Sequence, residues 1–102
     1  MARTLKSPNE KVSISVVFDL ETGETIAAEN VTVTVYDWED EEITGIFVSG
    51  SVSVSGATAT ARVQAGTDGE KYKVVFKATT TNHIYEEIHY IIVTDILDQY
   101  KN

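Results

Sequence analysis

The chain has 102 residues, 42% of them hydrophobic, with no cysteine and a formal net charge of -8. This length suits one compact domain with a single core, and the lack of cysteine excludes disulfides, thiolate catalysis and cysteine-bound zinc. The acidic excess disfavours nucleic acid as a partner, because the field of the protein repels phosphate. The sequence has neither an apolar run of the roughly 20 residues that a membrane span needs nor a signal-peptide core. We therefore expect neither a membrane partner nor a signal peptide.

Val, Thr and Ile make up 35 of the 102 residues, whereas Leu occurs three times, a bias that favours strands over helices. Alternating apolar residues predict a first strand over residues 11–19. A turn around Gly23 follows, and residues 31–36 alternate again as a second strand. The acidic segment 37–42 has no such period and is typical of an exposed loop.

The second half of the chain repeats this pattern. Short strands are predicted at 46–48 and 52–54, and alternating alanines at 57–65 predict a strand packed closely against a partner sheet. A Gly-rich turn at 66–69 precedes a strand over 72–78. A hairpin turn at Asn82 and His83 leads into a last strand over 84–94, whose apolar phase slips near Ile91 and predicts a bulge.

About seven short strands with frequent turns and no crossover helix predict an all-β fold. The favoured architecture is an immunoglobulin-like antiparallel sandwich of two sheets, and a small β-barrel is the alternative. Residues 1–95 should form the single domain and 96–102 a C-terminal tail. Strand parity predicts a core made of Val12, Ile14, Val16, Phe18, Val31, Val33, Val35, Val63, Val74 and Phe76.

A Tyr follows the Gly-rich turn at the start of the penultimate strand. In immunoglobulin-like domains a Tyr in this position can form a tyrosine corner, in which its hydroxyl bonds to upstream backbone. Asp68 and Tyr72 are the candidate residues. An ordinary core-edge Tyr is the alternative.

No arrangement of residues predicts catalysis. The two histidines lack the partners of a hydrolytic triad, and the sequence contains neither a phosphate-binding loop nor a nucleophile elbow. Glu87 and His89 share a strand face, but two ligands without a third favour a solvated face over a metal site. The acidic loop lacks the ligand spacing of a preformed calcium site. We therefore predict no enzyme activity, no cofactor, no metal and no small-molecule substrate.

The acidic loop contains the only Trp of the chain. An indole in a loop either marks a contact surface or folds back over the end of a sandwich, and the sequence leaves both open. The candidate contact residues are Asp37, Trp38, Glu39 and Asp40.

Several segments, in this order and spacing, carry a family resemblance. They are Lys6-Ser7-Pro8-Asn9-Glu10, then Gly23-Glu24-Thr25-Ile26-Ala27-Ala28 leading into Val31-Thr32-Val33, then Ser53-Val54-Ser55-Gly56, and finally Gly66 and Gly69 before Tyr72. From Lys6 to Val93 the chain resembles the small fibre-tail adaptor-type proteins of tailed bacteriophages and prophages, which are β-sandwich components of the virion.

The resemblance implies a non-catalytic structural protein of the phage tail. Its partners would be other virion or tail proteins and copies of itself in a ring. It would be made in the bacterial cytoplasm and reside in the virion. The alternative is an extracellular adhesion module that binds carbohydrate or calcium through Tyr36, Trp38 and the acidic loop.

Overall fold

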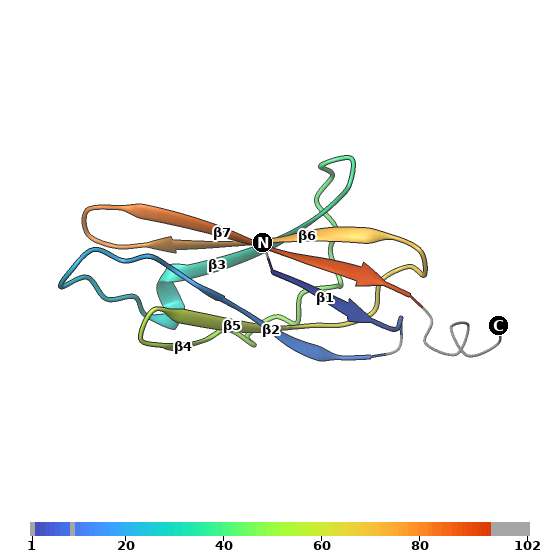
Figure 1. The fold of residues 1–102 in the computed structure, drawn as a ribbon, viewed down its shortest axis with the longest axis horizontal. Helices are drawn as coiled ribbons and strands as arrows, with labels where there is room; N and C mark the ends of the chain where they lie inside the picture. Colours follow the sequence, from blue (N-terminus) through green and yellow to red (C-terminus); the bar gives the residue numbers. More distant parts are fainter. Residues whose placement is uncertain (1, 9, 95–102) are drawn as a thin grey trace.

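The computed structural model describes residues 2–8 and 10–94, which form two sheets packed face to face (Figure 1). The first sheet has four strands and the second has three. In chain order the strands are β1 (Ala2–Lys6), β2 (Val12–Val17), β3 (Val31–Asp37), β4 (Ser53–Ser55), β5 (Thr58–Val63), β6 (Lys71–Thr79) and β7 (Ile84–Val93), with a 3-10 turn η1 (Ala28–Asn30) before β3.

The strand order identifies the fold as an immunoglobulin-like sandwich. The sheets run β1-β7-β6-β3 and β2-β5-β4. If β2 to β7 are given the letters B to G, the two orders contain G-F-C and B-E-D, as in the immunoglobulin fold. β1 is an additional strand beside G. The predicted two-sheet sandwich is thereby confirmed, and the sheets do not close into the alternative barrel. One pairing differs from the antiparallel prediction, because β1 runs parallel to β7.

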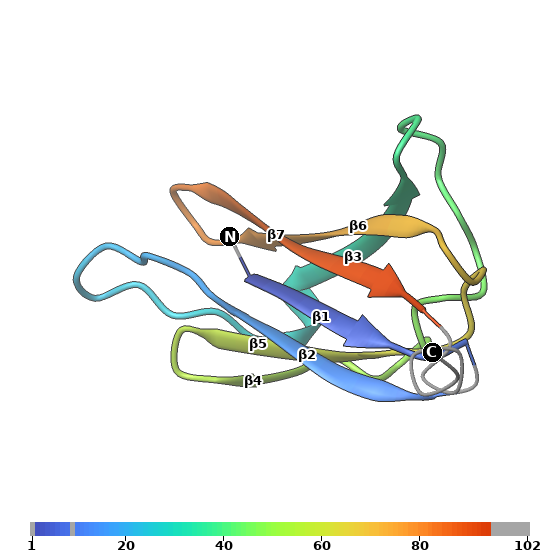
Figure 2. The same cartoon turned by 45° about the vertical axis from the view of Figure 1, so that its right-hand side comes forward.

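The connection between the first two strands explains the parallel pairing. β1 belongs to the four-stranded sheet and β2 to the three-stranded one, so the chain changes sheets between these two strands (Figure 2). A strand that leaves its sheet in this way forms no hairpin with its successor, and β1 pairs instead with the last strand. The sequence prediction missed β1, whose five residues do not alternate clearly.

Two other local predictions need correction. The predicted strand at 46–48 is an isolated bridge between Phe47 and Val63, because this segment crosses between the sheets. The predicted bulge near Ile91 is absent, and β7 pairs with β6 without interruption from Ile84 to Ile92. The apolar phase slips because Ile91 is buried, whereas Ile92 lies on the outer face of the same sheet.

The core lies between the sheets and contains most of the residues that parity predicted. Val12 and Val33 are only half-buried and lie at the margin of the core. Ala59 and Ala61 are fully buried, so β5 packs closely against the opposite sheet. The other predicted core residues are buried: Ile14, Val16, Phe18, Val31, Val35, Val63, Val74 and Phe76.

His89 also faces the interior, and the prediction of a solvated face is wrong for this residue. Its ring is 6% exposed and lies between β7, β1 and β2. Nδ1 lies 3.3 Å from the carbonyl oxygen of Ser15, which can only accept, so Nδ1 carries the proton. Nε2 then accepts a hydrogen bond from the Thr4 hydroxyl at 2.7 Å. Burial lowers the pKa of His89 and favours this neutral form.

Residues 10–94 contribute to one sandwich with one core. The expected tail at 96–102, and residue 95 at the domain boundary, lie outside the described residues.

Candidate functional site

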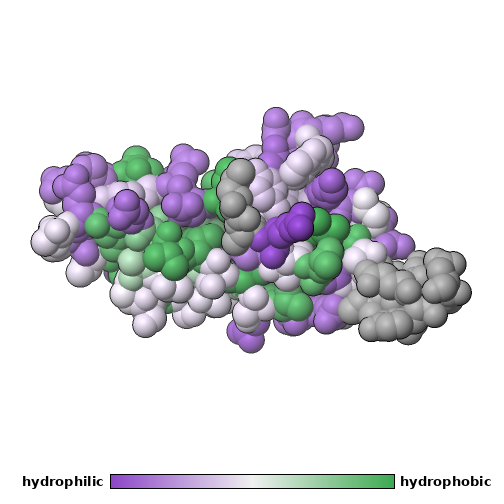
Figure 3. All heavy atoms as spheres, in the orientation of Figure 1, coloured by the Kyte–Doolittle hydropathy of each residue, from purple (hydrophilic) through white to green (hydrophobic). Residues whose placement is uncertain are grey.

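The acidic loop after β3 is held in shape by its own polar groups. The Asp37 carboxylate accepts hydrogen bonds from the backbone N–H groups of Glu39 and Glu41 at 2.8 and 2.9 Å. Asp40 has a positive φ of 65° and its carboxylate pairs with the Lys73 ammonium on β6. Figure 3 shows hydrophilic side chains gathered where this loop projects. The loop is therefore a folded extension of the sheet.

Trp38 lies against the outer face of the four-stranded sheet and keeps 54% of its surface exposed. Its indole meets the Tyr90 ring edge-on, with centroids 5.5 Å apart. The ammonium groups of Lys71 and Lys73 lie 5.7 and 5.5 Å from the indole centroid, within cation-π range. These contacts orient the ring without burying it.

A pocket of about 190 Å³ lies beside the indole. We call its surroundings the Trp38 face, defined by Arg3, Trp38, Lys71, Lys73, Tyr90 and Ile92. The strand register places Arg3, Tyr90 and Lys73 in one row across β1, β7 and β6. Lys77 lies further along the same face of β6 and pairs with Glu86. Four of the eight basic residues of an acidic chain thus share one outer face.

Sequence reasoning found Trp38 but missed its neighbours on the sheet. Tyr90 and Lys73 could have been placed by counting back along both strands from the hairpin at Asn82, which sets them opposite each other. Arg3 could not, because β1 was not predicted. Among the described residues, the acidic loop does not bring three ligand groups together for a metal ion.

Tyr72 closes the end of the sandwich near this loop. It is 5% exposed, and its hydroxyl accepts a hydrogen bond from the backbone N–H of Thr67 at 3.0 Å. This upstream backbone contact is the geometry of a tyrosine corner. Gly66 lies beneath the ring with a φ of +100°, and an added Cβ would lie 2.7 Å from Cγ2 of Val93. Asp68 is exposed in the same turn.

A buried lysine joins the N-terminal strand to this turn. Lys6 is 1% exposed, and its ammonium donates hydrogen bonds to the carbonyl oxygens of Ser7 and Ala65. Burial lowers the pKa of Lys6, while Glu10 opposes this shift. The two carbonyl partners compensate part of the cost of removing the ammonium from water.

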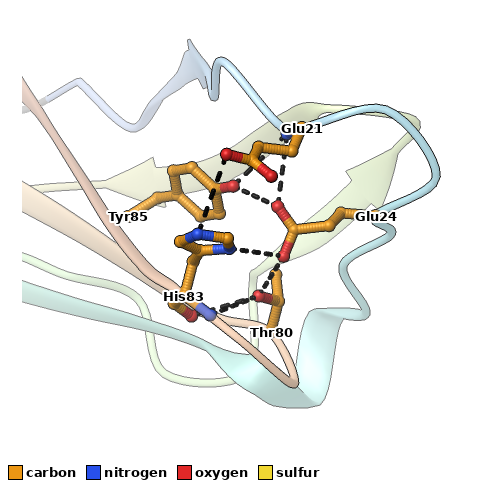
Figure 4. A network of polar contacts seen from close by, with 5 residues as sticks. All are labelled: Glu21, Glu24, Thr80, His83 and Tyr85. Carbon is orange, nitrogen blue, oxygen red and sulfur yellow. Dashed lines mark hydrogen bonds and ion pairs between the residues drawn. The ribbon is translucent and has the colours of Figure 1, made fainter.

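The opposite end of the sandwich carries a polar cluster that the sequence did not reveal (Figure 4). We call it the Glu24 cluster, and it joins the loop after β2 to the hairpin between β6 and β7. The Glu24 carboxylate accepts hydrogen bonds from the hydroxyls of Thr80 and Tyr85 and lies 3.1 Å from Nδ1 of His83. Nε2 of His83 faces the Glu21 carboxylate at 3.8 Å.

The donors around Glu24 shift the pKa values of the cluster. Hydrogen bonds from Thr80 and then Tyr85 lower the pKa of Glu24 to about 2. The hydrogen bond with Glu24 raises the pKa of His83 and also that of Tyr85. Glu21, Glu24 and His83 have the spacing of metal ligands. Because three side-chain donors already occupy the Glu24 carboxylate, we interpret the cluster as a clamp between two loops.

The fold and the exposed Trp38 face define the class of protein. This is an immunoglobulin-like sandwich whose four-stranded sheet carries aromatic and basic side chains on its outer face. The family model described as podophage GP4 fiber-tail adaptor protein gp77 matches residues 6–91, and the chain belongs to this family. No curated protein matches the sequence.

Family membership confirms the predicted role of a structural fibre-tail adaptor of a tailed phage. As an adaptor, the chain interacts with other tail or fibre proteins. The comparisons give no support to the adhesion alternative. In the described part of the chain, no helix has the length and apolar character to cross a membrane.

Proposed function

We propose that the chain is a non-catalytic adaptor of the virion that attaches a tail or fibre protein through the Trp38 face. The family match over residues 6–91 is the observation that carries the adaptor role. The chain would be made in the bacterial cytoplasm and built into the tail during assembly. Its partners would be other virion proteins and neighbouring copies of the same chain.

The Trp38 face has the composition of a contact surface. Aromatic residues and Arg are enriched at the centres of protein interfaces, where they supply most of the binding energy. Trp38 and Tyr90 are held edge-on, and Arg3 lies in the same row as Tyr90. Because the indole is oriented before binding, little side-chain entropy is lost when a partner covers it.

Charge indicates the chemistry of that partner. The chain has a net charge of -8, yet Arg3 and Lys71 lie beside the indole, together with Lys73, whose ammonium pairs with Asp40. A partner surface that combines an apolar patch with carboxylates would complement this face. Outside this face, the acidic surfaces of two copies of the chain would repel each other. We therefore expect an acidic docking surface on the tail or fibre protein.

A ring of copies would strengthen each of these contacts. Homo-oligomers are commonly symmetric, and one contact repeated around a ring gains strength through avidity. The number of copies should be visible as the rotational symmetry of averaged tail images, and a single copy for each tail would contradict the ring.

Substitution of Trp38 tests the contact surface. Trp38→Ala should weaken binding to the tail or fibre proteins of the same phage about tenfold or more, measured by calorimetry with purified proteins. Its free energy of unfolding should change by about 1 kcal/mol or less, because the indole is largely exposed. Val17→Ala is the matched control, since Val17 is 65% exposed on the outer face of the other sheet. Equal binding by both variants would overturn the assignment.

A further inference from the structure

One edge of the four-stranded sheet, at β3, is only partly paired. Its last residues are covered by the chain itself, because the Val35 carbonyl accepts from the Ile43 N–H at 2.8 Å and the Asp37 N–H donates to Glu41 at 2.9 Å. Backbone groups alternate in direction along a strand, so the N–H and C=O of Val33 point away from β6 in the same way. In residues 2–8 and 10–94, no backbone hydrogen bond joins Val33 to a segment beyond this edge.

A groove runs along this open edge. It consists of two pockets of about 440 and 200 Å³ that share Val33 and Phe47 in their linings. Val31 and Val52 line the larger pocket, so its wall is mostly apolar. Val33, Phe47 and Val52 are half-buried at the margin of the core. An apolar groove beside unpaired strand groups is the setting in which an extended peptide adds to a sheet.

The rim of the groove is negatively charged. Glu29 borders the larger pocket and Glu42 the smaller one, and both are exposed. Neither lining contains Lys or Arg. The charge near this edge is thus opposite in sign to that of the Trp38 face, and it favours a basic occupant.

We propose that the β3 edge is a second docking site, which accepts an extended segment of another virion protein as an additional strand. The segment carries apolar side chains at alternate positions, which enter the groove beside Val33 and Phe47, and Lys or Arg close to Glu29 and Glu42. The identification of the donor as a virion protein rests on the proposed function, whereas the binding site itself rests on the groove.

Charge also argues against a second copy in the same groove. Two copies that paired β3 with β3 would bring Glu29 and Glu42 of each close to those of the other, and like charges placed together are destabilising. An adaptor must hold two different proteins, and the Trp38 face and the β3 edge would provide separate, oppositely charged sites for them.

Synthetic peptides test strand addition. The probe is an acetylated and amidated peptide of sequence Lys-Val-Thr-Val-Lys-Val-Lys, added to the whole protein. Two further versions carry N-methyl groups on alternate residues, one version on the odd and the other on the even positions. Because a strand pairs through every second residue, one methylated version should lose about tenfold or more in affinity and the other should bind nearly as the parent peptide does.

Amide hydrogen exchange and charge-reversing substitutions locate the peptide on the protein. Peptide binding should slow amide hydrogen exchange at Val33 about tenfold, while the amides of β1 remain unchanged. Glu29→Lys should weaken binding about fivefold at low salt. Glu70→Lys is the control, since it makes the same charge change at an exposed position in the turn before β6.

Three results would overturn the proposal. These are equal binding by both methylated peptides, equal losses in Glu29→Lys and Glu70→Lys, and dimerisation of the free protein through β3. Trp38→Ala separates this proposal from the proposed function, because it should leave peptide binding intact. Peptide binding combined with unaltered partner binding by Trp38→Ala would reject the Trp38 face and retain the groove.

Discussion

The two ends of the sandwich are each closed by a tyrosine, but by different chemistry. Tyr72, at the start of β6, is buried and accepts a hydrogen bond from the backbone of Thr67. Tyr85, near the start of β7, is half-buried and donates to the Glu24 carboxylate. The first contact is neutral and relies on close packing, whereas the second belongs to a charged cluster. One fold can thus combine a closure that depends on shape with one that depends on pH.

The sharpest way to separate the two ends is to substitute their glycines. Gly66→Ala should destabilise the protein by about 3 to 5 kcal/mol, because the new methyl group would meet Val93 at 2.7 Å and the backbone has a φ of +100°. Gly23 also has a positive φ, of +89°, but nothing lies within 4 Å of its added Cβ. Gly23→Ala should therefore cost only about 1 to 2 kcal/mol of backbone strain. Denaturant unfolding measures both losses in unfolding free energy. Equal losses would show that the two ends do not differ in how closely they are packed.

The tyrosine hydroxyls provide a smaller and more specific test. Tyr72→Phe should lower the free energy of unfolding by about 1 kcal/mol, since it deletes one neutral hydrogen bond within a packed corner. The loss should be the same at pH 6 and pH 8, because the contact joins a hydroxyl to a backbone N–H and involves no charged group. A loss that changed with pH would show that this end is coupled to a charged group.

The pH dependence of the Glu24 cluster is the least disruptive test. The pKa of His83 is raised in the folded state, so its stabilising contribution is complete below its unfolded pKa near 6.5 and is lost as pH rises through the folded value. His83→Gln should lack this loss. The difference in unfolding free energy between the parent protein and His83→Gln should therefore shrink from pH 6 to pH 9.

Asn82→Ala serves as a control for His83→Gln, because Asn82 lies in the same turn without a titratable group. Its difference from the parent protein should stay constant over this range. A His83 ring whose pKa, measured by NMR, lay at or below 6.5 would contradict the clamp.

The fold was largely predictable because most of its strands bury every second residue. Parity identified β2, β3, β5 and β6 and most of the core between them. Parity failed where packing against another strand determines which side chains are buried. In β1 the apolar Leu5 is exposed and Lys6 is buried, so its sequence shows no apolar alternation and only its pairing with β7 identifies it as a strand. His89 is likewise buried only because β1 and β2 pack against it.

The candidate sites were harder to predict, because their contacts join residues that are far apart in the sequence. Trp38 stood out in the sequence because an indole within an acidic loop is unusual. Glu24 and His83 carry no local signal, and their contact depends on how two distant loops meet at one end of the sandwich. The open edge of β3 was equally hidden, because a strand's sequence does not tell which of its edges is left unpaired.

The buried ring of His89 gives the molecule a sensitivity to acid that opposes that of His83. Its folded pKa is lowered, so its contribution is complete above the unfolded value near 6.5 and declines as pH falls below that value. A proton gained there would place a charge where the N-terminal strand meets both layers, while a proton lost from His83 would loosen the far hairpin. From these two residues we expect the free energy of unfolding to be highest at intermediate pH, because the contribution of His89 falls on the acid side and that of His83 on the alkaline side.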